Sequence, residues 1–331
     1  MNAAKTKGRI LTGHRPTGPR HIGHLVGTLE QWAKMQDDYE CYFLIADLHV
    51  LTTDYEHPER IQENIVNVVA DWLAAGIDPA RATLVRQSAL AQHAQLSQLF
   101  GMMTTVARLE RVPTYKDQIQ NLGLNPSLGL LAYPVLQSAD ILVYKANLVP
   151  VGEDQMPHIE LTREVARRFN TLYGETFPEP DGLLTKTARL PGVDNRTMHS
   201  SYNNAIRFIE SEEETTKKVM SMYTDPTRLR ATDPGTVEGN PVFEYHDVFN
   251  PNKDEVEDFK TRYREGKVGD VEVKKSLATA LNTYLRPIRE RRTEFLKDPA
   301  KVVKILDDGT EKARPLVEAT FDEVMRKMGL R

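Results

Sequence analysis

The sequence predicts an α/β fold, in which a Rossmann-like parallel sheet with flanking helices is followed by an all-helical part. Segments 41–47 and 148–151 are short apolar runs, as found in strands that are buried on both faces of a parallel sheet. Strand-like and helix-like segments alternate through the first half of the chain, which is typical of βαβ units. After about residue 200 the strand pattern fades and helical spacing dominates.

The individual elements follow from local patterns. A strand over 9–13 leads into a turn rich in glycine and proline, and apolar residues at helical spacing predict a helix over 58–75 that ends at Gly76. The other elements expected in the first half are a strand over 82–86 and helices over 90–109, 128–144 and 153–173. In the second half we expect helices over 211–222, 254–263, 271–297 and 302–330, the last interrupted at 307–309, and a long connection over 224–251.

Composition places the chain among globular proteins. Its 331 residues are 40% apolar and 27% charged, and the length suffices for two domains. One cysteine excludes an intrachain disulfide framework and a cysteine-rich zinc site. The chain starts without the apolar core of a secretory signal and lacks an apolar run long enough to span a membrane. We therefore expect a cytoplasmic protein without a membrane span.

Contact with nucleic acid would need a local basic patch, because the net charge is −4 and the pI is about 6.2. Residues 258–298 offer one, with 11 Lys and Arg against 7 Asp and Glu. Charge alone fits a solvated helix face with ion-pair partners better than a nucleic-acid site.

The motif His21-Ile22-Gly23-His24 stands where a helix is expected to begin. Backbone N–H groups and the positive end of the helix dipole can bind a phosphate there, and a glycine lets the phosphate approach closely. The two histidines add hydrogen-bond donors. A loop with two surface histidines is an almost equally good interpretation of four residues.

Helix 128–144 carries three polar residues on one face, Tyr133, Gln137 and Asp140. The surrounding residues are apolar, so the carboxylate of Asp140 needs a hydrogen-bond donor. That donor is either a ligand N–H group, such as an indole, or a side chain of the protein itself.

Two polar segments and several histidines complete the candidates. Segment 149–155 is a strand end that meets a helix start, where acidic residues either accept hydrogen bonds from ribose or cap the helix. Segment 196–204 is a polar loop before a helix. We expect no metal site, because His93, His158 and His246 lack the paired spacing of metal ligands.

Taken together, these segments resemble the tryptophanyl-tRNA synthetases, a family of class I aminoacyl-tRNA synthetases. The resemblance covers most of the chain and rests on segments 12–18, 21–24, 139–142, 149–155, 158–163 and 285–288. It implies a nucleotide-binding catalytic domain over 1–195, a helical anticodon-binding domain over 196–300 and a C-terminal segment over 301–331 that packs back on the catalytic domain. It also implies a homodimer.

The resemblance further implies roles for single residues. Asp140 would accept the indole N–H of tryptophan, and His49 would line the same side of the site. The other implied contacts to the amino acid are Tyr133, Gln137 and Gln155. The implied ATP contacts are Arg15, Gly23, His24, Gly152, Asp154, Met198, Ser200 and Ser201. The implied catalytic residues are His21, His24, Lys116 and Arg196. In the helical domain the expected tRNA contacts are Lys274, Lys275, Arg289 and Arg292.

The second motif of the family, Lys-Met-Ser-Lys-Ser, is altered. Here the aligned residues are Thr197-Met198-His199-Ser200-Ser201, so both lysines are missing. In the family these lysines neutralise charge on the leaving pyrophosphate. We expect Arg196 or His199 to compensate, and Arg15, where the family often has glutamine, to add positive charge. The change suggests an auxiliary or specialised member.

The sequence is therefore interpreted as a tryptophan–tRNA ligase that uses ATP with Mg²⁺, tryptophan and tRNA(Trp). Two alternatives stay open at this point. One is a protein derived from a synthetase that binds tryptophan or ATP but has weak aminoacylation, supported only by the altered motif. The other is a tyrosyl-tRNA synthetase, which shares the architecture.

Overall fold

The computed structural model describes residues 7–113, 115, 126–184, 190–198, 204–226, 228, 230 and 232–331. The chain divides into two compact units. The first unit comprises Met1–Gly18, Gln31–Lys186 and Asp298–Arg331, and the second comprises Pro19–Glu30 and Thr187–Lys297. The motif at 21–24 thus belongs to the second unit. The expected domains were continuous ranges of the sequence, whereas each of these units is made of separate segments.

The first unit is built on a five-stranded parallel sheet with strand order β3-β2-β1-β4-β5. The strands are β1 (Arg9–His14), β2 (Glu40–Ile45), β3 (Thr83–Arg86), β4 (Leu148–Val151) and β5 (Asp181–Leu184). This confirms the predicted α/β class with a Rossmann-like sheet. The sequence pattern did not predict β5, because only its backbone pairing with β4 identifies this short and largely unburied strand.

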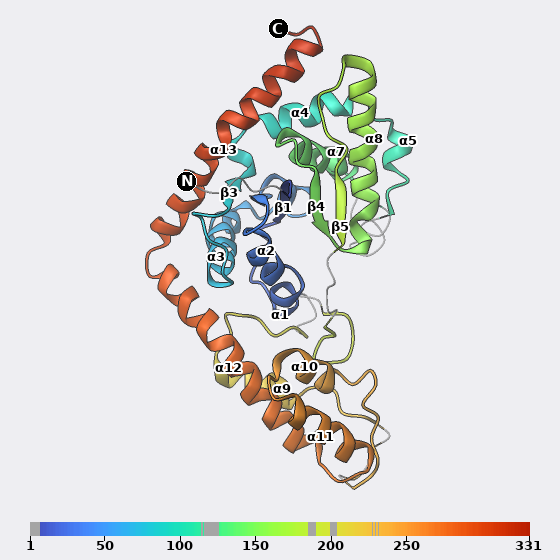
Figure 1. The fold of residues 1–331 in the computed structure, drawn as a ribbon, viewed down its shortest axis with the longest axis vertical. Helices are drawn as coiled ribbons and strands as arrows, with labels where there is room; N and C mark the ends of the chain where they lie inside the picture. The colour runs from blue at the N-terminus through green and yellow to red at the C-terminus, as the bar shows by residue number, and fades with distance from the viewer. Residues whose placement is uncertain are drawn as a thin grey trace. The chain divides into compact units, whose positions relative to one another are not determined.

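Helices cover the sheet of the first unit (Figure 1). They are α3 (Ile61–Ala74), α4 (Gln92–Gly101), α5 (Val106–Leu109), α7 (Leu128–Val143), α8 (Met156–Tyr173) and α13 (Pro299–Lys327), and α2 (Glu30–Met35) starts at the boundary between the units. The single helix expected over 90–109 is in fact α4 and α5. Thr105 separates them, since its backbone is extended and its side chain caps α5 by accepting from the N–H of Arg108.

Helix α13 runs without a break through 307–309, so the expected interruption there is wrong. Gly309 serves close packing instead: a Cβ at this position would lie 2.1 Å from the carbonyl oxygen of Leu84 in β3. One residue further on, the hydroxyl of Thr310 accepts a 3.0 Å hydrogen bond from the N–H of Arg86. The C-terminal helix therefore packs directly on strand β3 (Figure 1).

An aromatic cluster lies at the carboxyl end of β1. Trp32 stacks on Phe43 and on His14, with ring centroids 5.1 and 4.6 Å apart, and all of the indole surface of Trp72 is buried nearby. The Nε1–H of Trp72 donates to Nδ1 of His14 over 3.1 Å. This cluster fixes the point from which the chain leaves β1.

The second unit is helical. A short helix α1 (Ile22–His24) continues through a π-helical turn (Leu25–Leu29), and the later helices are α9 (Glu212–Met220), α10 (Pro241–Phe249), α11 (Lys253–Arg264) and α12 (Asp270–Leu296). Helix α10 lies within the expected connection over 224–251, which was predicted from its content of proline, glycine and asparagine. Two of those residues start the helix, since Asn240 caps it and Pro241 occupies its first turn.

Among the described residues, no helix combines the length and the apolarity needed to cross a membrane.

Candidate active site

The carboxylate of Asp140 lies in the first unit, buried at the centre of a hydrogen-bond network. His93 Nδ1 and Gln87 Nε2 approach its Oδ1 at 2.7 and 2.8 Å. His49 Nε2 and the same amide of Gln87 approach Oδ2, each at 2.9 Å. An ionised carboxylate only accepts hydrogen bonds, so both imidazoles donate. Its roughly four acceptor positions are thus occupied by protein donors.

Burial and hydrogen bonding act in opposite directions on Asp140. Burial by itself raises the pKa of a carboxyl group, but the hydrogen bonds from His49 and His93 outweigh it and hold the pKa of Asp140 below its ordinary value. Asp140 is therefore ionised at neutral pH. On the far side of His93, Nε2 accepts from the Tyr144 hydroxyl at 3.1 Å.

Gln87 and His93 are residues of this site that sequence reasoning missed. Gln87 is completely buried and also accepts a 3.0 Å hydrogen bond from the N–H of Leu48, beside His49. It thus ties the segment of His49 to the helix of Asp140. Its place directly after β3 is a signal that could have found it, since ligands of parallel sheets sit beyond the carboxyl ends of the strands. Nothing in the sequence marks His93, because its partner lies 47 residues away.

Tyr133 lies between His49 and His158. Its ring meets that of His49 edge to face at a centroid distance of 6.3 Å and that of His158 at 5.5 Å. The hydroxyl oxygen of Tyr133 is 3.4 Å from Nε2 of His158. The structure thus brings together three of the predicted amino-acid contacts, Tyr133, His49 and Asp140. Gln137, half-buried, lies on the same helix between Tyr133 and Asp140.

Asp154 and Gln155 form a pair at the start of α8, where Gln155 Nε2 donates to Asp154 Oδ2 over 2.8 Å. Asp154 is exposed. A Cβ on Gly152 would lie 2.7 Å from Asp154 Oδ1, so glycine leaves that carboxylate room. Arg15, after β1, donates to the hydroxyl of Thr53, and burial lowers the pKa of its guanidinium.

The motif at 21–24 lies in the second unit. The rings of His21 and His24 are 3.8 Å apart, and the backbone N–H of His21 approaches Nδ1 of His24 at 3.4 Å. Burial lowers the pKa of His24 well below its ordinary value, and the neighbouring His21 and Arg20 lower it further. His24 is therefore neutral at pH 7.

Within the same unit, the segment that follows the altered second motif pairs with the first motif. The N–H of Ile22 donates to the carbonyl of Ile206 over 2.9 Å, and His21 forms a β-bridge with Arg207. From the second motif itself, Met198 lies with its sulfur 3.4 Å from the position of a Cβ on Gly23. Residues separated by about 175 positions in the sequence thus meet.

Arg196 is exposed and pairs with Asp194 at 2.7 Å. Burial raises the pKa of Asp194, but hydrogen bonds from Asn204 and Arg196 reverse this and lower it. Lys116, His199, Ser200 and Ser201, to which roles were assigned from the resemblance, lie outside the described residues.

Two of the four expected tRNA contacts are used inside the second unit. The ammonium group of Lys274 is buried and donates to the carbonyl of Met222 and the hydroxyl of Thr224. The guanidinium of Arg289 donates to Phe208, Asn282 and Thr215. The expectation is corrected for Lys274, because its ammonium group is buried, whereas Arg289 is only half-buried and stays a predicted tRNA contact. Lys275 is exposed and Arg292 is half-exposed.

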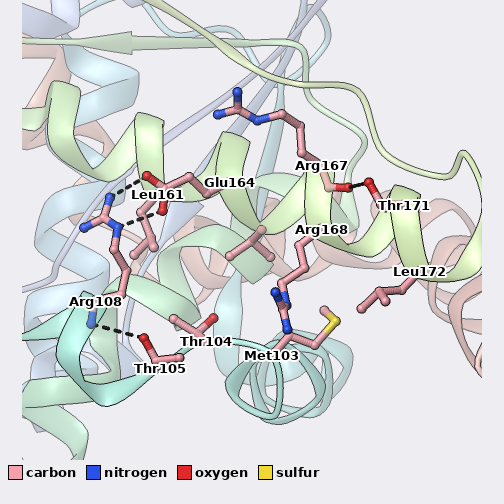
Figure 2. A pocket seen from close by; sticks show the side chains of 11 residues that line it. Met103, Thr104, Thr105, Arg108, Leu161, Glu164, Arg167, Arg168, Thr171 and Leu172 are labelled. Atoms are coloured by element: carbon pink, nitrogen blue, oxygen red, sulfur yellow. Dashed lines mark hydrogen bonds and ion pairs between the residues drawn. The ribbon is translucent and has the colours of Figure 1, made fainter.

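A separate hollow of about 520 Å³ lies in the first unit, lined by residues 103–105 between α4 and α5, by α5 and by α8. Figure 2 shows Arg108 and Glu164 joined across it by paired hydrogen bonds of 2.7 and 2.9 Å, with Met103 and Leu172 along its apolar side. None of the residues that line it is among the predicted site residues.

Comparisons with known proteins identify the family of the chain. The family model of class I tRNA synthetases specific for tryptophan and tyrosine matches residues 3–286. The chain therefore belongs to this family of class I aminoacyl-tRNA synthetases.

Within the family, the chain is similar to curated tryptophan–tRNA ligases at 40% to 50% identity. That of Treponema pallidum is 50% identical over 97% of each chain, and that of Chlamydia caviae is 48% identical over 98% of this chain and 96% of the relative. The structure of the tryptophanyl-tRNA synthetase of Campylobacter jejuni, complexed with ADP and tryptophan, superposes with a TM-score of 0.89 at 33% identity. It covers 97% of this chain and 100% of the other.

Proposed function

We propose that this protein ligates tryptophan to tRNA(Trp) at the expense of ATP. The observation that carries the proposal is the ionised, buried carboxylate of Asp140, two helical turns from Tyr133 on the same face of α7. Tryptophan carries one N–H group on its indole ring and an ammonium group at the other end, so a site for it needs an acceptor at each end. The identity to tryptophan–tRNA ligases over the full chain supports the same substrate.

The reaction proceeds in two steps. An oxygen of the tryptophan carboxylate attacks the α-phosphorus of ATP, the bond to the bridging oxygen breaks, and pyrophosphate leaves with the electron pair. A ribose hydroxyl at the end of the tRNA then attacks the carbonyl carbon of the adenylate, and AMP leaves. Neither step needs a covalent bond to the enzyme, so the protein contributes positioning and charge stabilisation. Mg²⁺ enters as part of the substrate, bound to the ATP phosphates.

For the amino acid, we assign roles to residues of the first unit. Asp140 accepts the indole N–H, which requires that one protein donor give up its place on the carboxylate. Tyr133, Gln137 and Gln155 hold the backbone atoms of tryptophan. His49 lines the side of the site next to Asp140.

For ATP, the proposal assigns roles within each unit by itself. In the first unit, Asp154 is an exposed acceptor for ribose hydroxyls, Gly152 leaves it room, and Arg15 supplies positive charge. In the second unit, Gly23 and Met198 lie together and His24 is neutral, which suits a role as hydrogen-bond partner rather than as a fixed charge. Arg196 replaces the positive charge of the missing lysines.

The helical second unit is proposed to contact the anticodon end of tRNA, through its exposed basic residues such as Lys275. A homodimer, implied by the resemblance, and a cytoplasmic location, expected from composition, stay predictions.

Pyrophosphate exchange with each amino acid tests the proposal. We expect ATP formation from labelled pyrophosphate with tryptophan and at least 100-fold less with tyrosine, in line with the discrimination that a missing hydrogen-bonding partner produces. Exchange with tyrosine alone would favour the tyrosyl enzyme. Tight binding of tryptophan without exchange would favour a binding protein that has lost activation, which the altered second motif would then explain.

A further inference from the structure

Tyr133 in α7 and His158 in α8 face each other. A pair of hydroxyl groups, called here the polar clasp, joins the two helices and fixes their alignment. The hydroxyl of Ser138 in α7 lies 3.0 Å from that of Thr162 in α8. Each hydroxyl oxygen also lies 2.9 Å from a carbonyl oxygen one turn earlier in its own helix, that of Pro134 for Ser138 and that of His158 for Thr162. Each hydroxyl has one proton, so one hydroxyl donates to the other and the accepting hydroxyl donates to its own carbonyl. The clasp therefore sets the register that brings the Tyr133 hydroxyl to His158.

His158 is buried with only 2% of its surface exposed, and Tyr133 is half-buried. Their 3.4 Å contact joins the tyrosine oxygen to the imidazole Nε2. Hydrogen bonds in active sites are often long before the ligand binds. A tyrosine hydroxyl that donates to an imidazole nitrogen keeps its oxygen lone pairs for a second partner.

We propose that His158 is a positioning residue, whose Nε2 accepts the hydroxyl proton of Tyr133 and so turns the tyrosine oxygen toward the ammonium group of the bound amino acid. This inference rests on the proposed function. It assigns the two ends of the substrate to two ends of one helix face: the indole N–H to Asp140, and the ammonium group to a hydroxyl that His158 holds as an acceptor.

The ionisation state of His158 fits this role. Burial lowers its pKa to about 4, with His49 lowering it further and Asp154 opposing the shift. The ring is therefore neutral at pH 7 and keeps the lone pair that accepts from Tyr133. A protonated ring would donate to the tyrosine oxygen and place a positive charge beside the ammonium group.

A comparison of two ligands tests the proposal. Indole-3-propionate has the indole and the carboxylate of tryptophan but lacks the ammonium group. In His158→Leu we expect the KM for tryptophan in pyrophosphate exchange to rise about tenfold, the effect of one lost hydrogen bond to a charged group. The inhibition constant of indole-3-propionate and kcat should both change less than twofold. His158→Gln, which retains an acceptor, should recover most of the affinity for tryptophan.

Tyr133→Phe supplies the matched control. In that background His158→Leu should have no further effect on the KM for tryptophan, because the hydroxyl that it orients is gone. Equal weakening of tryptophan and indole-3-propionate in His158→Leu would overturn the proposal, and so would an undiminished effect in the Tyr133→Phe background. Should His158→Leu fail to fold, His158→Phe, a planar ring without an acceptor, is measured with the same two ligands. Equal weakening of tryptophan and indole-3-propionate, or no weakening of tryptophan, contradicts the role. Absence of exchange in the unmodified protein would instead refute the proposed function.

Discussion

Replacing Asp140 by alanine removes the acceptor of four hydrogen bonds of 2.7–2.9 Å that come from three buried side chains. The donors of His49, His93 and Gln87 are then left in a buried site without their acceptor. Breaking a buried network of this kind costs on the order of 3–5 kcal/mol. We therefore expect urea unfolding to show that the free energy of unfolding falls by this amount. Because such a loss of stability also lowers activity, a fall in activity alone would not reveal the role of Asp140 in recognition.

Specificity is the quantity that separates recognition from stability. Benzothienylalanine has sulfur where tryptophan has the indole N–H, and thus has no donor for Asp140. In the unmodified protein the ratio of kcat/KM for tryptophan to that for the analogue contains the contribution of this hydrogen bond. A hydrogen bond to a charged group contributes about 2–3 kcal/mol, or roughly 30- to 150-fold. We expect the ratio to fall by that factor in Asp140→Ala.

Asp47 provides a matched control for this experiment. It is also a buried carboxylate beyond a strand end, and it accepts from Arg86 and Ser88 at 3.0 and 2.9 Å. Asp47→Ala should lower stability without changing the ratio between the two substrates. If the ratio in folded Asp140→Ala changes less than threefold, Asp140 has only a structural role and the reasoning is refuted.

The same network makes stability depend on pH. The pKa of Asp140 is lower in the folded protein than in the unfolded chain, where it is near ~4. The contribution of Asp140 to stability is fully present above its pKa in the unfolded chain. It is lost as the pH falls through its pKa in the folded protein. Below about pH 4 the free energy of unfolding should therefore fall less steeply with pH in Asp140→Ala than in the unmodified protein. Urea unfolding measured from neutral to acid pH checks this.

Three further outcomes are expected. Gly309→Ala should lower the free energy of unfolding by about 3 kcal/mol, because its Cβ would overlap a carbonyl of β3, whereas Gly101→Ala, which has open space around it, should be tolerated; equal effects in urea unfolding would contradict this packing. Arg196→Ala should lower kcat of pyrophosphate exchange roughly tenfold, about 1.4 kcal/mol, with little change in the KM for tryptophan, and an unchanged kcat would remove Arg196 from the reaction. Lys275→Glu should weaken tRNA binding and reduce its salt dependence, while Lys274→Met should lower stability and leave the tRNA dissociation constant unchanged; the reverse result would show that Lys274 does reach tRNA.

Sequence periodicity predicted the helices that bury one face and the strands that are buried along their whole length. The apolar run over 41–47 became β2, and the helix expected over 128–144 is α7. Patterns failed where a tertiary contact decides the conformation. Gly309 would break an isolated helix, yet here it lets α13 approach β3, and the exposed strand β5 exists only through its pairing with β4.

The candidate site shows the same division. Tyr133 and Asp140 share one helix, so their spacing alone predicted a common face. Gln87 and His93 reach the same carboxylate from other segments, and no local pattern encodes a contact over 47 to 53 residues. Lys274 was assigned to tRNA from charge, but charge says nothing about burial, and its ammonium group is used inside the fold.

The aromatic cluster at the end of β1 has a spectroscopic consequence. Trp32 and Trp72 are the only two tryptophans of the chain, and both are buried within one cluster of the first unit. All intrinsic tryptophan emission of the protein therefore originates from a single place, and the second unit emits none. A shift of that emission during unfolding reports loss of the first unit alone, whereas far-ultraviolet circular dichroism also records the helices of the second. Comparing the two signals in one titration measures whether the units unfold together.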